Sequence, residues 1–560
     1  MTAQNTPLNT PISQIPPTVR EAVVELCRST GMTTVFGNPG STELRMFRDW
    51  PGDFRYVLGL QESTAVATAA GYALGTGRAP LVSLHSAGGV GHSLGAVFNA
   101  YRDRVPLVIV AGQQSRALLQ LRPFLGADEP ASFPRPYVKW SLQPARAEDV
   151  PAALAEAHRL AMTHPRGPVF LSVPEDDWDR PGEVPAPRTV HDGFSADPEA
   201  LAALGRRLDA CERPALVVGP GVSDERVDDA VRELAERTRA AVWISPMSGR
   251  SGFPEDHPYF QGFLPPVPGQ LARQLAPYDV VVALGAPLFT YHVHAEGAHL
   301  EAGTELFHLD CDPEQAAWLP TGTSLITTLS PALRTLNGLV KQSDRPAPGS
   351  RVLPSPAPRR TTGAAGPAPI TPEQVMDALR QRMPYGAVLV EEAPSHRDAL
   401  HARLPVTVPG GFLTTGSGAL GWGLPLAVGR ALAAAEHEGS ERVVCVLGDG
   451  SALYSVQALW TAARHRAPVS YVLLDNEGYG AVQALGRRIG LDAVPGTDIG
   501  GIDFAALALS MGCPAERAAE AGELDAALDR VLAQDGPTGP RLLHVRVAPG
   551  EDTLYEGGEE

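Results

Sequence analysis

The sequence predicts an α/β protein of three doubly wound domains, each built on a parallel sheet, and this prediction has three sources. The chain's 560 residues correspond to three or four domains at about 150 residues each. Two proline-rich stretches, near residues 179–197 and 344–372, divide it into three segments. Within each segment, short β-branched apolar runs alternate with amphipathic stretches rich in alanine and leucine, which is the pattern of βαβ units.

The expected boundaries follow from these divisions. We predict a polar N-terminal tail over residues 1–16, α/β domains over 17–180, 197–343 and 371–552, and a proline-rich linker over 344–370. The expected strands are 33–36, 55–60, 79–85, 106–112 and 167–173 in the first domain, 214–219, 241–246, 279–285 and 305–310 in the second, and 386–391, 442–450, 470–476 and 541–547 in the third.

The charge and the lysine content argue against several classes of function. With 46 basic and 63 acidic residues, the formal net charge is −17, which disfavours nucleic acid and anionic membranes as partners. The only lysines in the sequence are Lys139 and Lys341, and neither follows a glycine-rich loop. A pyridoxal Schiff base or a P-loop phosphate site would need one of them, so both enzyme classes are disfavoured.

The cysteines and the N-terminus indicate a cytoplasmic protein. Five cysteines are scattered without a CxxC pair, which favours a reducing compartment over a disulfide framework or a thiolate zinc site. Residues 1–17 lack the basic start and apolar core of a signal peptide. No apolar run reaches membrane-spanning length, so we expect no membrane partner.

The clearest functional signal lies in residues 443–480, where two apolar strands end in polar residues. The first strand ends in GDGS, which contains Asp449, and the next ends in DNEG, which contains Asn476. Adjacent parallel strands would bring these two side chains to one edge of a sheet. Carboxylate and amide oxygens suit Mg²⁺, and the glycines would let backbone amides approach a diphosphate. The sequence therefore predicts a site for Mg²⁺ and a diphosphate.

Polar residues also follow strands of the first two segments. The loop GNPGS at 37–41 follows one strand, Glu62 follows another, and His85 ends a third. In the second segment, His292 and His294 are weak candidates for metal ligands, because no cysteines or carboxylates cluster near them. A GPG turn at 219–221 leaves FAD or NAD as an alternative ligand, although its third glycine position holds an aspartate.

Together these motifs resemble those of the thiamine-diphosphate-dependent 2-oxo acid decarboxylases. The GDG sequence, followed one helix and one strand later by a pair ending in asparagine, is similar to the family's diphosphate motif, although the usual Asn-Asn is Asp475-Asn476 here. The resemblance implies pyrimidine-binding, central and diphosphate-binding domains, in that order. It also implies thiamine diphosphate and Mg²⁺ as cofactors, with Ca²⁺ or Mn²⁺ able to substitute, and Asp449, Asn476 and Gly478 as metal ligands.

Nearly the whole chain after residue 17 is similar to the benzoylformate decarboxylase branch of this family, in segments such as LHSAGGVG, PRPYVKWS and GDGSALYSVQALWTAA. This resemblance implies that Glu62 hydrogen-bonds the aminopyrimidine ring and activates the cofactor. It implies that Ser41 binds the substrate carboxylate and that His85 and His292, as partners, move protons. Leu420 would lie beneath the bent cofactor. The further implied cofactor contacts are Ser395, Gly418, Gly450, Ser451 and Tyr479.

The predicted substrate pocket departs from that branch. Thr414 and Leu485 stand where the branch has aromatic rings, Phe124 stands in a pair of leucine positions, and Val482 replaces a leucine. One ring gained and two lost indicate a reshaped pocket. Because such contacts discriminate substrates by only a few kcal/mol, the preferred 2-oxo acid stays open. The predicted pocket residues are Phe124, Leu125, Thr414, Ala481, Val482 and Leu485.

The resemblance predicts nonoxidative decarboxylation of a small 2-oxo acid, of the benzoylformate type or a related aryl or branched acid, to an aldehyde and CO₂. A carboligating enzyme of the acetohydroxyacid synthase type is the alternative, although paired histidines favour protonation and hence the lyase. An inactive cofactor-binding protein is a further alternative, against which an intact Glu62 argues. Because one cofactor has to contact both Glu62 and Asp449, we expect a homodimer or homotetramer with active sites at the subunit interface.

Overall fold

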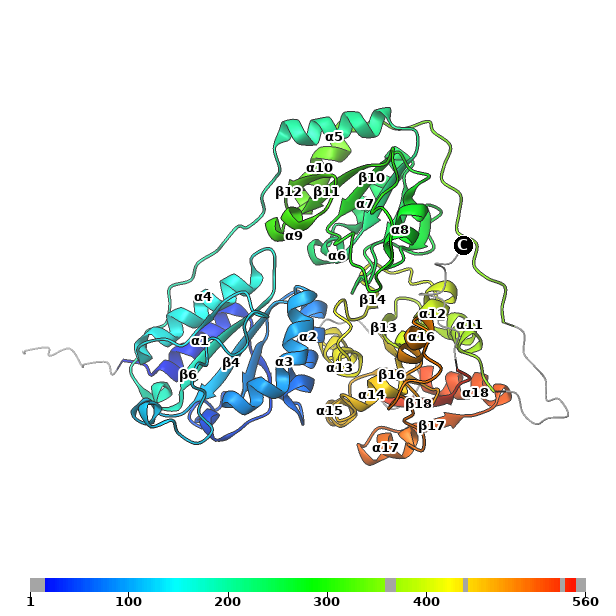
Figure 1. Ribbon diagram of the computed structural model, residues 1–560. Helices are drawn as coiled ribbons and strands as arrows, with labels where there is room; N and C mark the ends of the chain where they lie inside the picture. Colours follow the sequence, from blue (N-terminus) through cyan, green and yellow to red (C-terminus); the bar gives the residue numbers. More distant parts are fainter. Residues whose placement is uncertain (1–15, 358–368, 437–441, 534–538, 550–560) are drawn as a thin grey trace, which may run out of the picture.

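The computed structural model describes residues 16–357, 369–436, 442–533 and 539–549. These residues form three parallel six-stranded sheets with flanking helices, which confirms the predicted fold class (Figure 1). Nearly all of the predicted N-terminal tail and residues 358–368 of the predicted linker lie outside the described residues. No described helix combines the length and the apolar character needed to cross a membrane.

The N-terminal domain has the strand order β2-β1-β3-β4-β6-β5, with helices on both faces of the sheet (Figure 1). The order reverses between β1 and β3, so the carboxyl ends of these two strands form the crevice where ligands of such sheets bind. The strands are β1 (Thr34–Gly37), β2 (Arg55–Leu58), β3 (Leu81–Leu84), β4 (Leu107–Gln113), β5 (Ser141–Leu142) and β6 (Pro168–Pro174). The helices are α1 (Val19–Thr30), α2 (Glu62–Thr76), α3 (Ser86–Arg102) and α4 (Val150–Met162), with short 3₁₀ turns η1 (Ser41–Glu43), η2 (Arg116–Leu121), η3 (Ala147–Asp149) and η4 (Glu175–Asp179).

The central domain has the order β12-β11-β10-β7-β8-β9. Its strands are β7 (Pro214–Val218), β8 (Ala241–Ile244), β9 (Phe260–Phe263), β10 (Val280–Leu284), β11 (Glu305–Asp310) and β12 (Thr323–Ile326). Its helices are α5 (Pro198–Ala210), α6 (Pro220–Glu225), α7 (Asp228–Thr238), α8 (Pro268–Leu275), α9 (Pro313–Trp318) and α10 (Leu329–Leu339). In the GPG turn after β7, the amides of Gly219 and Gly221 donate to the carbonyls of Leu284 and Gly285, each at 3.0 Å. This turn therefore directs two of its amides to the backbone at the end of β10, unlike a loop that presents its amides to a phosphate.

The C-terminal domain has the order β14-β13-β15-β16-β18-β17, which reverses between β13 and β15. Its strands are β13 (Val388–Glu392), β14 (Phe412–Leu413), β15 (Val443–Gly448), β16 (Val469–Asp475), β17 (Ala515–Ala518) and β18 (Arg541–Arg546). Its helices are α11 (Pro372–Arg382), α12 (Arg397–Arg403), α13 (Gly423–Ala434), α14 (Asp449–Leu453), α15 (Ala458–His465), α16 (Gly480–Arg488), α17 (Phe504–Ser510) and α18 (Ala521–Leu532), with the 3₁₀ turn η5 (Pro394–His396). The central strands are apolar and buried on both faces, as expected for parallel sheets.

One hydrophobic core is shared by the N- and C-terminal domains. It joins side chains of α2 and β3 to side chains of α13, β15 and β16 in one cluster of buried residues. Glycines allow α2 and α13 to approach closely, because a Cβ built on Gly71 would overlap the carbonyl of Leu426 and one on Gly429 would overlap the carbonyl of Thr68. The central domain instead has separate clusters of its own. The N- and C-terminal domains are therefore one packing unit.

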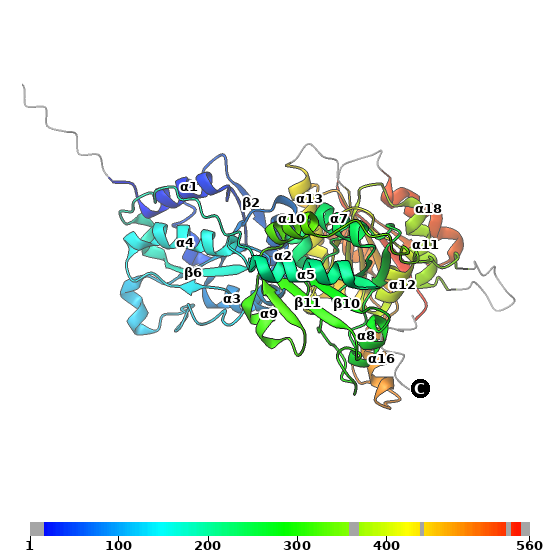
Figure 2. The same ribbon diagram turned by 90° about the horizontal axis from the view of Figure 1, so that it is seen from above.

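The central domain lies across the boundary between the other two domains (Figure 2). Arg250, which follows β8, is buried and forms an ion pair with Asp224 of its own domain. Its guanidinium also donates to the backbone carbonyl of Asp103 in the N-terminal domain at 2.5 Å. Its backbone forms an antiparallel bridge with Leu413 of the C-terminal domain. A single arginine thus contacts all three domains.

A buried glutamate at the boundary between the central and C-terminal domains predicts a pH effect on stability. Burial raises the pKa of Glu255 to about 8, and its nearest cation, Arg351, lies 4.0 Å away. Since the folded-state pKa exceeds the unfolded value, the favourable contribution is complete below about pH 4.5 and is lost as the pH rises through about 8. The parent protein should therefore lose stability between pH 5 and pH 8.5 in a way that Glu255→Gln does not. The difference in urea midpoint between the variant and the parent protein should shift in favour of Glu255→Gln as the pH rises over this range. The exposed Glu301→Gln is the control. If the difference in urea midpoint between Glu255→Gln and the parent protein were the same at pH 5 and pH 8.5, the prediction would be wrong.

Candidate active site

A small cavity of about 70 Å³ lies where the strand order of the C-terminal sheet reverses, at the carboxyl ends of β13, β15 and β16. It brings together all seven residues predicted to contact the metal or the cofactor diphosphate, together with two predicted pocket residues. Its lining consists of Ala393, Pro394, Ser395, His396, Leu420, Gly448, Asp449, Gly450, Ser451, Asn476, Gly478, Tyr479, Ala481 and Val482.

Asp449 is the buried carboxylate of this cavity. One of its oxygens accepts from the Gly450 amide at 2.7 Å and the other accepts from the Gly478 amide at 3.1 Å, so it links the loops that follow β15 and β16. Burial and the adjacent Asp475 carboxylate raise the pKa of Asp449 to about 6. Asp475 differs, because hydrogen bonding to His544 and the charge of Arg546 lower its pKa. The two acidic groups at this sheet edge are thus electrostatically distinct.

The oxygen atoms at and near Asp449 are suitable ligands for a hard cation. Among the described residues, no arginine or lysine forms an ion pair with Asp449, and no group of three or more His, Cys, Asp or Glu side chains gathers to bind a metal by itself. A site here would use one carboxylate, the Asn476 amide and the Gly478 carbonyl, which is an oxygen set suited to Mg²⁺ that keeps other ligands. A cation would also stabilise the ionised form of this buried carboxyl group.

The rim of the cavity depends on two close glycine contacts. A Cβ built on Gly480 would lie 2.9 Å from Asn476 Nδ2 and 3.0 Å from Ser395 Oγ. A Cβ built on Gly450 would lie 2.5 Å from the ring of Tyr479. Ser395 Oγ also accepts from the Ala481 amide at 3.0 Å. The glycines therefore keep these polar side chains close together around the cavity.

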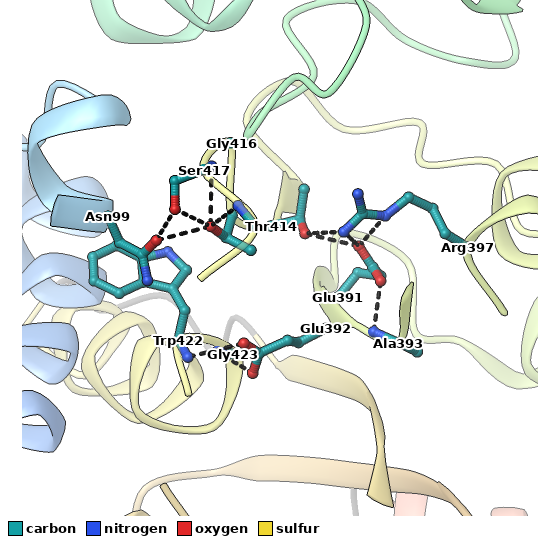
Figure 3. Close-up of polar contacts among 12 residues, drawn as sticks. Asn99, Glu391, Glu392, Ala393, Arg397, Thr414, Gly416, Ser417, Trp422 and Gly423 are labelled. Atoms are coloured by element: carbon teal, nitrogen blue, oxygen red, sulfur yellow. Dashed lines mark hydrogen bonds and ion pairs between the residues drawn. The ribbon is translucent and has the colours of Figure 1, made fainter. Parts of the chain in front are cut away.

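Glu392, at the end of β13, is a buried residue of this site that sequence reasoning missed. Its two oxygens accept from the amides of Gly421 at 2.8 Å, Trp422 at 3.0 Å and Gly423 at 2.9 Å (Figure 3). It thereby holds the segment after Leu420 and the start of α13. Burial raises its pKa to about 7. A carboxylate at a strand end is the only sequence signal for it, and that signal is common in solvated loops.

Glu62 is the first residue of α2 and is buried. Asn38 Nδ2 donates to its Oε1 at 3.4 Å, and His92 Nδ1 lies 3.2 Å from its Oε2. Asn38 belongs to the predicted GNPGS loop, whereas His92 was not predicted. Its position on α3, within GHSLG, gave no separate signal. The carboxylate is thus held in the N-terminal crevice and does not line the C-terminal cavity.

His85 is the N-cap residue just before α3, in the same crevice, and its ring packs against Gly40, where a Cβ would overlap it. Its Nδ1 lies 3.1 Å from Thr42 Oγ1 and 3.1 Å from Glu43 Oε2. The predicted partner, His292, is not among the hydrogen-bonding partners that the described structure gives His85. Ser41 begins η1 with an exposed side chain.

Glu43 was missed because its position also suits an ordinary helix cap. It is buried, its Oε2 accepts from the Gly40 amide at 2.8 Å, and its Oε1 accepts from Thr42 Oγ1 at 2.5 Å. The carboxylate can accept the Nδ1 proton of His85, which leaves Nε2 as the other ring nitrogen able to carry or release a proton. Glu43 therefore orients the predicted proton carrier.

Glu43→Gln should lower kcat by about tenfold or more and alter the pH dependence of kcat, because a carboxylate that fixes the imidazole is replaced by a neutral amide. The measurement is the steady-state rate across pH 5.5–9. Glu225→Gln is a matched control, since Glu225 also caps backbone amides, those of Leu329 and Ser330, in the central domain. An unchanged pH profile and kcat for Glu43→Gln would rule out the orienting role.

His292 lies on a loop of the central domain with an exposed side chain, and its amide donates to the Pro266 carbonyl at 3.0 Å. Burial of part of the ring and the charge of Arg397 lower its pKa. Arg397 belongs to α12, so His292 faces the C-terminal domain of its own chain. The predicted proton carriers thus lie in two different regions of the chain.

The predicted pocket residues are dispersed in the single chain. Phe124 is 86% exposed and Leu125 is 38% exposed. Thr414 is buried, donates to Glu391 Oε2 at 2.7 Å and accepts from Arg397 at 3.2 Å (Figure 3). Leu485 is half-buried on α16, outside the cavity lining. Thr414 therefore belongs to a polar network, at a position where the related branch was expected to have an aromatic ring.

Comparison with known proteins identifies the class. Residues 17–132 match the thiamine pyrophosphate enzyme N-terminal TPP binding domain, residues 201–336 the central domain, and residues 395–539 the C-terminal TPP binding domain. The chain belongs to the thiamine pyrophosphate enzyme family, as its motifs predicted.

The chain is more similar to a benzoylformate decarboxylase than to an acetolactate synthase subunit of the same family. The chain is 40% identical over 524 residues to benzoylformate decarboxylase of Pseudomonas aeruginosa PAO1, covering 93% of this chain and 97% of the relative. Over 538 residues it is 28% identical to the acetolactate synthase isozyme 2 large subunit of Escherichia coli K12, covering 94% of each. The structure of a thiamine diphosphate-dependent 4-hydroxybenzoylformate decarboxylase of Rhodococcus jostii RHA1 superposes with a TM-score of 0.90 at 37% identity, covering 96% of this chain and 100% of that one. The predicted class, a thiamine-diphosphate-dependent carboxy-lyase, is confirmed.

Proposed function

We propose that this protein decarboxylates an aryl or branched 2-oxo acid of the benzoylformate type to an aldehyde and CO₂, using thiamine diphosphate and Mg²⁺. The observation that carries the proposal is the His85–Glu43 pair at the reversal point of the N-terminal sheet, next to Ser41. A histidine oriented by a carboxylate is suited to proton delivery, which a nonoxidative decarboxylase needs before it releases an aldehyde. The 40% identity to a benzoylformate decarboxylase supports the same reaction.

Each predicted side chain has a defined task in this proposal. Bound thiamine diphosphate supplies the electron sink for the carbon that loses CO₂. Asp449, Asn476 and Gly478 would hold Mg²⁺, while Ser395, Gly450, Ser451 and Tyr479 would contact the diphosphate. Glu62 would hydrogen-bond the aminopyrimidine, Ser41 would bind the substrate carboxylate, and His85 and His292 would move protons.

A substrate panel tests the reaction. Purified protein with thiamine diphosphate and Mg²⁺ should release CO₂ and an aldehyde from benzoylformate or from another aryl, indolyl or branched 2-oxo acid. The exposed Phe124 and the polar Thr414 network mean that the best substrate need not be benzoylformate itself. Failure with every acid in the panel would refute the proposal.

The metal requirement is tested separately. Dialysis against a chelator should abolish activity, and Mg²⁺ should restore it, with Ca²⁺ or Mn²⁺ as substitutes. Asp449→Asn should weaken metal-dependent cofactor binding, since it removes the one charged donor of the proposed set. Full activity after complete metal removal would contradict the assignment.

Carboligation is the second candidate, supported by the 28% identity to an acetolactate synthase subunit over 94% of the chain. The two reactions share the cofactor. They differ in whether the carbon that has lost CO₂ is protonated or adds to a second carbonyl compound. Product analysis with and without an added acceptor aldehyde separates them. A 2-hydroxyketone as the main product would favour carboligation.

We also propose a cytoplasmic homodimer or homotetramer with active sites at the subunit interface. Glu62, His85 and Ser41 do not line the C-terminal cavity of their own chain, and apolar side chains of the N-terminal domain, including Leu121 and Phe124, are exposed. Five buried, unpaired cysteines are consistent with a reducing compartment. Sedimentation should show an oligomer, and an active monomer would contradict this arrangement.

A further inference from the structure

The loop formed by residues 415–420 follows β14 and ends at Leu420 in the cavity wall. The amides of residues 416–419 all donate hydrogen bonds. A carboxylate of the N-terminal domain takes the first amide, and two hydroxyls within the loop take the next three. These bonds are Gly416 N to Asp103 Oδ1 at 3.1 Å, Ser417 N and Gly418 N to Thr415 Oγ1 at 3.2 Å each, and Ala419 N to Ser417 Oγ at 3.1 Å.

Asn99, on α3 of the N-terminal domain, organises this set of bonds (Figure 3). It is buried, and its Oδ1 accepts from Thr415 Oγ1 at 3.1 Å and also from Ser417 Oγ. Its Nδ2 donates to the Ala419 carbonyl at 3.0 Å. Asp103, which caps the C-terminus of α3 one helical turn after Asn99, faces the same loop through Gly416. Because the two hydroxyls give their protons to Asn99, their lone pairs remain for the loop amides.

The bonds around Asn99 also set the direction of one carbonyl. In a trans peptide, the Gly418 carbonyl points opposite to the Ala419 N–H. Ser417 Oγ holds that N–H, so the Gly418 carbonyl points away from the hydroxyls. Gly418 has φ +80°, and a Cβ built there would meet no atom within 4 Å, so this part of the loop borders open space. Among the described residues, no donor forms a hydrogen bond with the Gly418 carbonyl.

We propose that Asn99 is a positioning residue that aims the Gly418 carbonyl at the aminopyrimidine of the cofactor; this rests on the proposed binding of thiamine diphosphate at this site. Asn99 does not itself contact the cofactor. It acts through the hydroxyls of Thr415 and Ser417, which fix the peptide planes on both sides of Gly418.

Only an amide side chain satisfies this position. The Ala419 carbonyl requires a donor, and the two hydroxyls require an acceptor, and asparagine presents both at one carbon. Aspartate has the same shape but is acceptor-only when ionised, so Asn99→Asp would place a buried carboxylate against the Ala419 carbonyl. The loop would have to rotate or retreat, and the Gly418 carbonyl would move with it.

The test compares Asn99→Asp with Asn337→Asp in the holoenzyme. Asn337 is a matched control, because it is also buried and its Nδ2 donates to a carbonyl, that of Ala230, at 3.0 Å, but within the central domain. The readouts are the Kd of thiamine diphosphate with Mg²⁺ by isothermal titration, kcat at saturating cofactor, and the melting temperature of the cofactor-free protein.

Asn99→Asp should raise the cofactor Kd or lower kcat by about tenfold or more, while Asn337→Asp changes neither by more than about twofold. Equal losses in the two variants, tracking an equal fall in melting temperature, would mean that Asn99 only stabilises the fold and would overturn the proposal. Parent-like Kd and kcat in Asn99→Asp would also overturn it.

Ser417→Ala keeps the test decisive if Asn99→Asp does not fold. It removes only the hydroxyl that holds the Ala419 amide and should raise the cofactor Kd in the same direction. An unchanged Kd in Ser417→Ala would overturn the proposal. The two hypotheses fail separately, because cofactor binding is measured without substrate. If the parent protein bound thiamine diphosphate but converted no 2-oxo acid, the proposed reaction would be refuted. The role of Asn99 would still be decided by the Kd of thiamine diphosphate in the variants.

Discussion

Glu62→Gln should reduce decarboxylation by about 100-fold or more while leaving metal-dependent thiamine diphosphate binding within a few fold of the parent protein. The amide keeps the shape of the side chain and its contact with Asn38, but it lacks the carboxylate that would stabilise the activated form of the aminopyrimidine. The measurements are kcat and the cofactor Kd on the same preparation.

Asp449→Asn provides the contrast for this experiment. Its carboxylate lies in the C-terminal cavity between the Gly450 and Gly478 amides, so its loss should weaken cofactor binding first and activity as a consequence. Glu62→Gln should show the opposite pattern, with binding retained and turnover lost. If Glu62→Gln turned over substrate at the parent rate, its assigned role would be wrong.

Gly429→Ala should destabilise the fold by about 3 kcal/mol or prevent folding, because a methyl group there would enter the space of the Thr68 carbonyl and lie 2.7 Å from the Tyr72 amide. Neither neighbour is the end of a flexible side chain, so α2 and α13 would have to separate and expose their shared core. Urea denaturation followed by circular dichroism measures the change in unfolding free energy.

The matched control is Gly338→Ala on α10, where a Cβ would meet no atom within 4 Å. This variant should be about 0.5–1 kcal/mol more stable than the parent protein, since alanine favours the helix more than glycine does. If both variants were equally stable, the close approach of α2 and α13 would not be the reason for glycine at position 429.

The sequence predicted the interior of each sheet well and its edges poorly. The runs at 106–112 and 279–285 became β4 and β10, which are buried on both faces and therefore continuously apolar. The strands without a prediction were β5, β9, β12, β14 and β17, and each lies at the edge of its sheet. Edge strands are short and pair on one side only, so packing against neighbours, not an apolar run, defines them.

The candidate site divides in the same way. Asp449 and Asn476 follow adjacent interior strands, so their meeting at one edge could be predicted from the chain order. Glu43, Glu392 and Asn99 act through hydrogen bonds that depend on how loops and domains pack. Asn99 and Thr415 are far apart in sequence, and nothing local to either residue signals their contact.

The shared core of the N- and C-terminal domains has a consequence for biosynthesis. The buried face of α2, with Val66, Ala69 and Ala70, is completed by α13. At roughly 5–20 residues per second, a ribosome needs on the order of tens of seconds between finishing α2 and starting α13. During that interval the nascent N-terminal domain presents an apolar helix face that its own chain cannot yet cover. We therefore expect chaperone dependence during translation, and aggregation of any fragment that stops before residue 423.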